Sequence, residues 1–308
     1  MIYQPNLKTF NQVINKNKSH VIWTSLVADL DTPVSTMIRI GQNSPYSFLL
    51  ESVEGGDTKG RYSILGLNPD LIWRSFGNKA EINYDPEKSL DKFIPDVKDT
   101  FSSLRELMKI SKIKIPKNLP PMASGLVGYL GFDNIKLIEK IPSNNPSKLN
   151  LPDGIFIRPK IMIIFDSVED TMTIITPVYI QNSNKLSIEE IYNKSCNNIE
   201  KIINLLKKPI ENKHFNKEII KVDNNITSNF TKANYLKIIK KAKDYILAGD
   251  IFQVVPSQRF EMPFNLPSFN LYRSLRRLNP SPFLYYLNFN DFAVIGSSPE
   301  ILVRLRNN

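Results

Sequence analysis

The chain has 308 residues, of which 42% are hydrophobic and 10% aromatic, a composition that excludes intrinsic disorder of the chain as a whole. At about 100–200 residues per domain, the length indicates two domains or one large one. The formal net charge of +10 comes mostly from lysines scattered among Asn and Ile, without a run of five or six basic residues, so no dedicated nucleic-acid binder is expected.

The first half of the chain predicts strands and helices in mixed order. Apolar residues recur at helical spacing over 6–16 and 89–109, and Asp-Thr-Pro at 31–33 opens a short helix that ends at Gly41. A turn is expected at 66–69, between two strands. Runs of β-branched and aromatic residues predict strands over 20–28, 46–52, 62–67, 70–76 and 124–130.

The remaining elements are separated by a change of composition. Residues 207–228 are rich in Lys and Asn and poor in aromatic residues, which indicates a linker. We therefore expect an N-terminal region over 1–210, a linker over 211–228 and the start of a second domain over 229–308. Helices are predicted over 132–139, 188–206, 231–247 and 269–278. Strands are predicted over 161–165, 172–177, 251–262, 283–289, 292–296 and 301–305.

The N-terminus and the apolar runs indicate where the protein is located, and the C-terminus indicates whether the chain is complete. MIYQPNLKTF lacks the charged start and apolar core of a secretory signal. The longest apolar runs, such as IMIIF, have the length of strands rather than of membrane-spanning helices. We therefore expect a cytoplasmic protein without membrane association. The last predicted strand has no return strand before Asn308, which predicts a chain that is incomplete at its C-terminus.

The segment LLESVEGGDTKGRYSILG, residues 49–66, is the most informative in chemical terms. A predicted strand ends in Glu51 and Ser52, a glycine-containing loop follows, and Arg61 opens the next strand. A carboxylate and a guanidinium at the mouth of a sheet can bind a small zwitterion. The protein carboxylate pairs with the ammonium group of the ligand, and the guanidinium pairs with the carboxylate of the ligand. A hairpin loop with solvated charges is the alternative, and spacing alone favours it.

Other chemical signatures are few. No Walker-type loop, dinucleotide fingerprint or HExxH spacing occurs, so no zinc site is expected. Cys196 is the single cysteine and lies in an amphipathic segment, which indicates a small helix residue rather than a nucleophile. RRLNPSPFLYYLNF, residues 276–289, combines a proline turn with an aromatic strand; this pattern suits either a core strand or the wall of a ligand pocket.

Five segments together resemble anthranilate synthase component I, a family of chorismate-using enzymes. They follow one another in the order of that family from about Thr24 to Arg306, and five ordered motifs are far more specific than any one alone. The segments are LLESVEGGDTKGRYSILG, GLVGYLGFDNIKLIEKIP, YILAGDIFQVVPSQRF, NPSPFLYYLNF and VIGSSPEILVR.

The resemblance implies an α+β fold in which two packed β-sheets are flanked by helices. It implies a lyase of tryptophan biosynthesis that converts chorismate and ammonia to anthranilate and pyruvate with Mg²⁺. The ammonia comes from glutamine through a glutamine amidotransferase partner, anthranilate synthase component II, and L-tryptophan inhibits from a separate site. Carried over by motif, the tryptophan-binding residues implied here are Glu51, Ser52, Pro282, Phe283, Leu284 and, less closely because the preceding loop varies in length, Arg61.

The family continues after VIGSSPEILVR with segments that this sequence does not contain. They carry the Mg²⁺-binding glutamates and the catalytic histidine region of the family. The resemblance therefore implies that catalytic residues and metal ligands lie beyond Asn308, that none is found within the chain, and that the chain alone makes no anthranilate.

Two alternatives remain open from the sequence. Aminodeoxychorismate synthase component I shares the N-terminal motifs, and LLESVEGG together with GDIFQVV favours anthranilate synthase over it. A stand-alone tryptophan-binding module is a hypothesis from a different class, and the open final strand argues against it.

Overall fold

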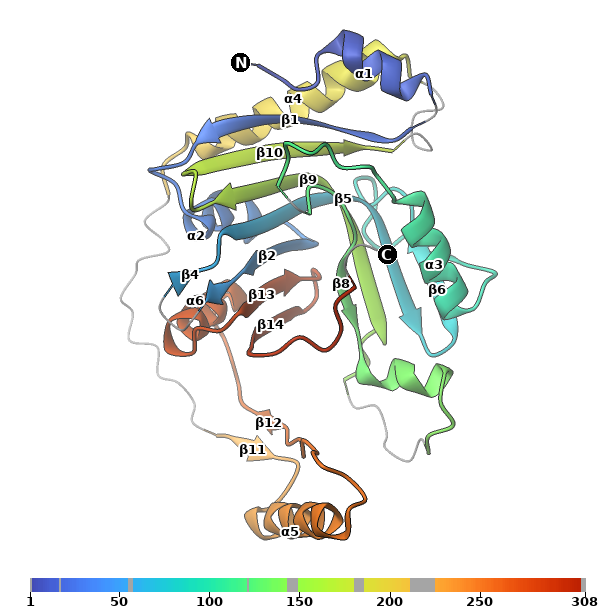
Figure 1. Cartoon of the computed structure of the whole chain (residues 1–308), viewed down its shortest axis with the longest axis vertical. Coiled ribbons are helices and arrows are strands. Elements are labelled where there is room, and N and C mark those ends of the chain that lie inside the picture. Colours follow the sequence, from blue (N-terminus) through green and yellow to red (C-terminus); the bar gives the residue numbers. More distant parts are fainter. Residues whose placement is uncertain are drawn as a thin grey trace. The chain divides into compact units, whose positions relative to one another are not determined.

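The computed structural model describes residues 2–16, 18–54, 58–120, 122–142, 149–179, 186–210 and 225–305 (Figure 1). The chain divides into two compact units. Unit 1 combines Met1–Ile210 with Ser268–Asn308, and unit 2 consists of Glu211–Pro267. Unit 1 contains the residues predicted to bind a ligand.

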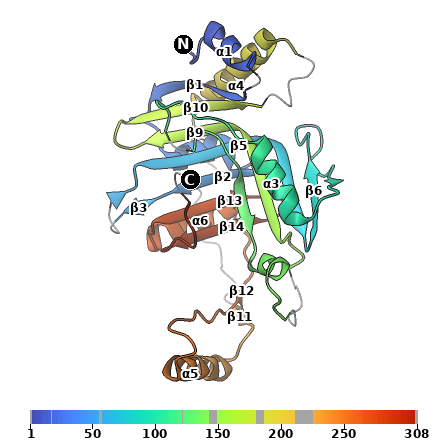
Figure 2. The same cartoon turned by 45° about the vertical axis from the view of Figure 1, so that its right-hand side comes forward.

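Unit 1 is built on a ten-stranded antiparallel sheet (Figures 1 and 2). Its main path has the order β1-β10-β9-β5-β2-β13-β14, while β6, β7 and β8 attach through β5 and β9. The strands are β1 (His20–Val27), β2 (Ser47–Glu51), β5 (Tyr62–Phe76), β6 (Lys79–Asn83), β7 (Ile94–Pro95), β8 (Val127–Leu130), β9 (Gly154–Asp166), β10 (Thr171–Val178), β13 (Phe283–Asn288) and β14 (Ala293–Ser298). A separate ribbon joins β3 (Val53–Glu54) to β4 (Thr58–Lys59).

The long strands β5 and β9 divide this sheet into two limbs. The first limb contains β1, β2, β10, β13 and β14 with the first half of β5 and the last part of β9. The second limb contains β6, β7 and β8 with the other ends of β5 and β9. The register of β5 against β9 shifts between Pro69 and Leu71. Such a bulge bends the strands where one limb passes into the other.

The first limb is buried on both faces, which explains the continuous apolar run IMIIF in β9. Ile163 packs into the core cluster on one face, and its neighbour Ile164 packs into the cluster on the other. The second of these clusters also contains Ile72 and Ile155 from the second limb, so the two limbs share a core. The α+β class is confirmed, and the two packed sheets of the expectation are two limbs of one sheet.

Helices cover one face of the first limb. Phe10, Met37, Ile199 and Tyr272 bring α1, η1, α4 and α6 into the same core cluster. The helices of unit 1 are α1 (Leu7–Ile14), α2 (Pro33–Thr36), η1 (Met37–Gly41), α3 (Thr100–Ile110), η2 (Phe132–Leu137), α4 (Ile188–Leu206) and α6 (Ser268–Leu278). Figure 2 shows α3 beside β6, and both contribute to a smaller cluster of their own. Cys196 is buried in α4, where burial raises the pKa of its thiol.

Four local predictions were wrong. The turn expected at 66–69 is absorbed into the continuous strand β5. Residues 89–99 are not helical; α3 begins after Asp99, which caps it, and β7 lies within this range. Only Phe260–Glu261 of the strand expected over 251–262 is β-structure, and residues 301–305 form no strand.

Unit 2 contains α5 (Lys232–Ala248) and a ribbon of β11 (Thr227–Ser228) and β12 (Phe260–Glu261). The linker expected over 211–228 lies mostly outside the described residues. Strands β13 and β14, in the region expected to begin a second domain, belong to unit 1, because β13 pairs with β2. In the described part of the chain, no helix is both long and apolar enough to span a membrane.

Candidate functional site

Four of the six residues predicted to bind a ligand line one cavity of about 200 Å³ in unit 1. Pro282 is exposed and Phe283 half-buried, and neither is part of the cavity wall. The four that line it are Glu51, Ser52, Arg61 and Leu284.

Strand pairing brings these residues together. β2 lies between β5 and β13, and Glu51 at its end stands opposite Leu284. Arg61 directly precedes β5, and the N–H of Gly60 donates to the carbonyl of Ser52 at 2.7 Å. A Cβ atom added to Gly60 would lie 2.5 Å from the Cβ of Ser52, so only glycine allows this close approach.

The carboxylate of Glu51 is held by α6. The hydroxyl of Tyr272 donates to Oε2 of Glu51 at 2.6 Å. Arg276 donates from Nε to the same oxygen at 2.7 Å and from Nη2 to Oε1 at 3.0 Å. Tyr272 and Arg276 are four positions apart, so both reach Glu51 from one face of the helix. The bidentate pair joins two segments that are 225 positions apart in the sequence.

These contacts affect the protonation of the two α6 side chains. Burial, reinforced by the neighbouring Glu51 carboxylate, raises the pKa of Tyr272 far above its ordinary value. Burial alone would lower the pKa of Arg276, but the hydrogen bond to Glu51, the charge of Glu51 and the contact with Tyr272 together outweigh it, so the pKa is raised. Tyr272 therefore stays a neutral donor and Arg276 a cation. A ligand ammonium that approaches Glu51 meets a carboxylate already neutralised by Arg276.

Arg61 is held in a second bidentate pair, with Asp166 at the end of β9. Its Nε lies 2.9 Å and its Nη2 2.7 Å from Oδ2 of Asp166. Burial alone would raise the pKa of Asp166. The hydrogen bonds from Arg61 and from the backbone N–H groups of Val168 and Glu169 outweigh this effect, so the pKa of Asp166 is lowered. About half of the Arg61 side chain remains exposed, so it can still face a ligand.

The charge of the wall favours a ligand with a positive group. Among the described residues, five carboxylates and two guanidinium groups line the cavity. Asp31 pairs with Arg39, whereas Asp29 and Asp170 form no ion pair with the residues that the structure describes. The apolar part of the wall comes from Ala28, Pro33, Phe165 and Leu284. Excess negative charge beside an apolar surface suits an amino acid with a large apolar side chain.

The sequence analysis missed Tyr272, Arg276 and Asp166. The first two lie in the helix predicted over 269–278, where a basic residue four positions after a tyrosine was the only available signal. Asp166 follows the apolar run of β9 and carries no motif of its own. None of the three could be linked to the 49–66 segment without knowledge of the strand order.

Among the residues that the structure describes, no group of three or more His, Cys, Asp or Glu side chains is placed to hold a metal ion. The described residues therefore do not form a site that fits the Mg²⁺ implied by the resemblance.

A comparison with protein-family models matches residues 40–308 to the family described as chorismate binding enzyme. The match begins within the predicted N-terminal region and covers most of the chain.

Curated relatives and a solved structure agree with this match. The chain is 42% identical over 303 residues to "Anthranilate synthase component 1" of Cereibacter sphaeroides, covering 98% of this chain and 60% of the relative. It is 36% identical to the protein of the same name from Aquifex aeolicus, covering 92% and 56%. The crystal structure of anthranilate synthase component I from Streptococcus pneumoniae superposes with a TM-score of 0.63 at 27% identity, covering 80% of this chain and 52% of that chain. The chain thus spans 60% or less of the length of these proteins.

Proposed function

Since this chain belongs to the family of chorismate binding enzymes, we propose that it acts as component I of anthranilate synthase. In this role it takes part in converting chorismate and ammonia to anthranilate and pyruvate. The observation that carries the proposal is the 42% identity to a relative of that name over 98% of the chain. The resemblance seen in the five sequence motifs supports the same assignment.

The proposal includes regulation by L-tryptophan at the cavity around Glu51. It rests on the convergence of Glu51, Ser52, Arg61 and Leu284 on one space of about 200 Å³. The ammonium of the amino acid would face the acidic wall, its carboxylate would face Arg61, and its ring would pack on Phe165 and Leu284. Because Glu51 and Arg61 are already paired with Arg276 and Asp166, binding adds to these pairs or rearranges them.

The proposal also includes a glutamine amidotransferase as the source of ammonia and Mg²⁺ as the ion that screens the anionic substrate. The described residues form no cluster that fits the ion. The part played by the chain's own residues is to build and hold the tryptophan cavity.

The proposal can be tested with a chimaera. The segment of the Cereibacter sphaeroides relative that this chain matches is replaced by this chain, and the purified product receives chorismate, ammonium and Mg²⁺. We expect the fluorescence of anthranilate to appear and L-tryptophan to suppress it. A folded chimaera that forms aminodeoxychorismate, or that turns over chorismate without responding to tryptophan, contradicts the proposal.

Ser52→Phe is expected to weaken tryptophan binding by at least about tenfold, equivalent to about 1.4 kcal/mol. Ser52 lines the cavity beside Gly60, so a phenyl ring there occupies the space meant for the ligand. Calorimetric titration of the chain with L-tryptophan measures the change. Ser52→Ala is the matched control, because it removes the hydroxyl without filling the cavity. Equal affinity of Ser52→Phe and the unchanged chain would refute the assignment.

A further inference from the structure

A groove of about 770 Å³ lies between α6 and the start of α2, and we call it the α6 groove. Four polar side chains form most of its α6 wall and recur at intervals of three and four positions, so they lie on one face of the helix. They are Asn270, Arg273, Ser274 and Arg277. Another face of α6 packs inward, where Tyr272 joins the core cluster. The helix therefore turns a continuous polar face towards the groove.

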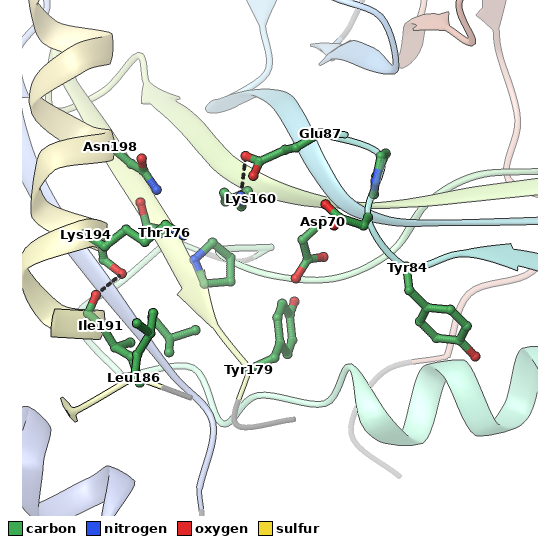
Figure 3. Close-up of a pocket in the computed structure, with 15 residues that line it drawn as sticks. Asp70, Tyr84, Glu87, Lys160, Thr176, Tyr179, Leu186, Ile191, Lys194 and Asn198 are labelled. Carbon is green, nitrogen blue, oxygen red and sulfur yellow. Dashed lines mark hydrogen bonds and ion pairs between the residues drawn. The ribbon is translucent and has the colours of Figure 1, made fainter. Parts of the chain in front are cut away.

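This polar face has no partner in the part of the chain that the structure describes. Its four side chains form neither an ion pair nor a hydrogen bond with the described residues, and no carboxylate among those residues lines the groove. By contrast, Figure 3 shows Lys160 paired with Glu87 at the edge of a cavity beside α4. The α6 groove thus carries positive charge that the described residues do not neutralise.

The helix dipole explains only part of this charge. Arg276 and Arg277 lie in the last turn of α6, where a cation stabilises the carbonyl groups at the helix end. Arg276 is also paired with Glu51. Arg273 lies near the middle of the helix, where the dipole contributes little. An anionic occupant of the groove accounts for Arg273 and Arg277 together.

Apolar side chains border the same groove. Val34 lines it from α2 and Leu278 from α6, and Leu278 is 84% exposed. Leu271, which is 44% exposed, lies two turns before Leu278 on the same side of the helix. An inorganic anion or a nucleic-acid backbone would neutralise the arginines but leave this apolar border in water. An occupant that carries both carboxylates and apolar side chains covers both features.

The spacing of the arginines suits a polypeptide. Arg273 and Arg277 are one helical turn apart, about 6 Å along the axis. Two carboxylates one turn apart on a second helix have the same separation, and each can accept two hydrogen bonds from a guanidinium.

We propose that the α6 groove docks an acidic segment of a partner protein that also carries leucine-like side chains. The carboxylates of the segment pair with Arg273 and Arg277. Its apolar side chains cover Leu278, and Asn270 and Ser274 donate to the remaining carboxylate oxygens. Docking therefore neutralises the polar face of α6 and removes its apolar border from water.

A labelled peptide of sequence EELLEELL tests the proposal, with fluorescence anisotropy on the full chain at physiological ionic strength. We expect saturable binding of this peptide, none of QQLLQQLL, which lacks the charges, and weaker binding of EEAAEEAA, which lacks the leucines. The combined substitution Arg273→Gln with Arg277→Gln is expected to weaken binding at least about fivefold, since it removes two exposed ion pairs. Arg105→Gln is the matched control, because Arg105 is an exposed arginine of α3 outside the groove.

Four results would overturn the proposal. Absence of saturable binding to EELLEELL, or unchanged affinity in the double variant with its thermal melting intact, would show that the groove docks no acidic segment. Equal affinity for EEAAEEAA would indicate a site for any anion, and tighter binding of a DNA duplex that depends on the same two arginines would indicate a nucleic-acid surface. Neither Arg273 nor Arg277 lines the cavity around Glu51, so calorimetry with L-tryptophan tests the proposed function separately.

Discussion

Replacing Asp70 by Asn is expected to lower the free energy of unfolding of the chain by about 3–5 kcal/mol. Arg158 is 1% exposed, and Asp70 is the carboxylate that neutralises it through two hydrogen bonds. Ser111 at 3.3 Å and the ring of Tyr179, whose centroid is 4.0 Å away, are neutral and cannot replace that charge. The substitution therefore leaves a cation buried without a counter-ion, which costs far more than the pair itself contributes.

Urea denaturation followed by circular dichroism measures this loss. Asp85→Asn is the matched control, since the same change breaks an exposed ion pair with Lys88. It should leave the urea concentration at the midpoint of unfolding unchanged. The double substitution Asp70→Asn with Arg158→Met removes the orphaned charge, so it should recover much of the stability. A double variant no more stable than Asp70→Asn would show that the charge is not the cause.

Gly128→Ala is expected to destabilise the chain by about 3 kcal/mol or more. Gly128 lies in β8 opposite Phe156, and a Cβ atom there would lie 1.9 Å from the carbonyl oxygen of Ile155. The obstacle is backbone of the central strand β9 rather than a movable side chain. Relief of the clash therefore requires β8 to separate from the second limb.

The control for Gly128→Ala is Gly131→Ala, three positions further along the chain. The added Cβ there would lie 3.0 Å from the carbonyl oxygen of Asp153, so a small shift suffices. In thermal melting, Gly128→Ala should have a melting temperature well below that of Gly131→Ala. Similar melting temperatures would mean that β8 can move away at little cost.

Elements whose signals are local were predictable from the sequence. The helix over 188–206 matches α4 because its apolar spacing and its capping box, formed by Ser187 and Glu190, act within a few residues. The hairpin of β13 and β14 followed from its alternation and turn in the same way. Glu51 and Ser52 were predicted to bind a ligand through a motif, and both line one cavity in the structure.

The failures occur where distant pairing overrides a local signal. Apolar spacing over 89–99 suggested a helix, but Ile94 and Pro95 pair with β6 as β7 instead. Asn-Pro at 68–69 suggested a turn, yet β9 pairs along both sides of it and a bulge absorbs the irregularity. The partner of Glu51 lay 225 positions away on α6, and no local pattern specifies a contact at that distance.

The pairing of β2 with β13 also means that β2 is synthesised on the ribosome long before its partner strand. Glu51 emerges long before its strand partner Leu284, so the edge of β2 has no neighbour on that side while the intervening chain is made. At about 5–20 residues per second this wait lasts roughly 10–50 s. During that time the nascent chain presents an open, largely apolar strand edge, which is a site for chaperones and for aggregation. Translation speed over the unit 2 segment should therefore influence the yield of soluble protein, although the described residues of that segment add no strand to the ten-stranded sheet.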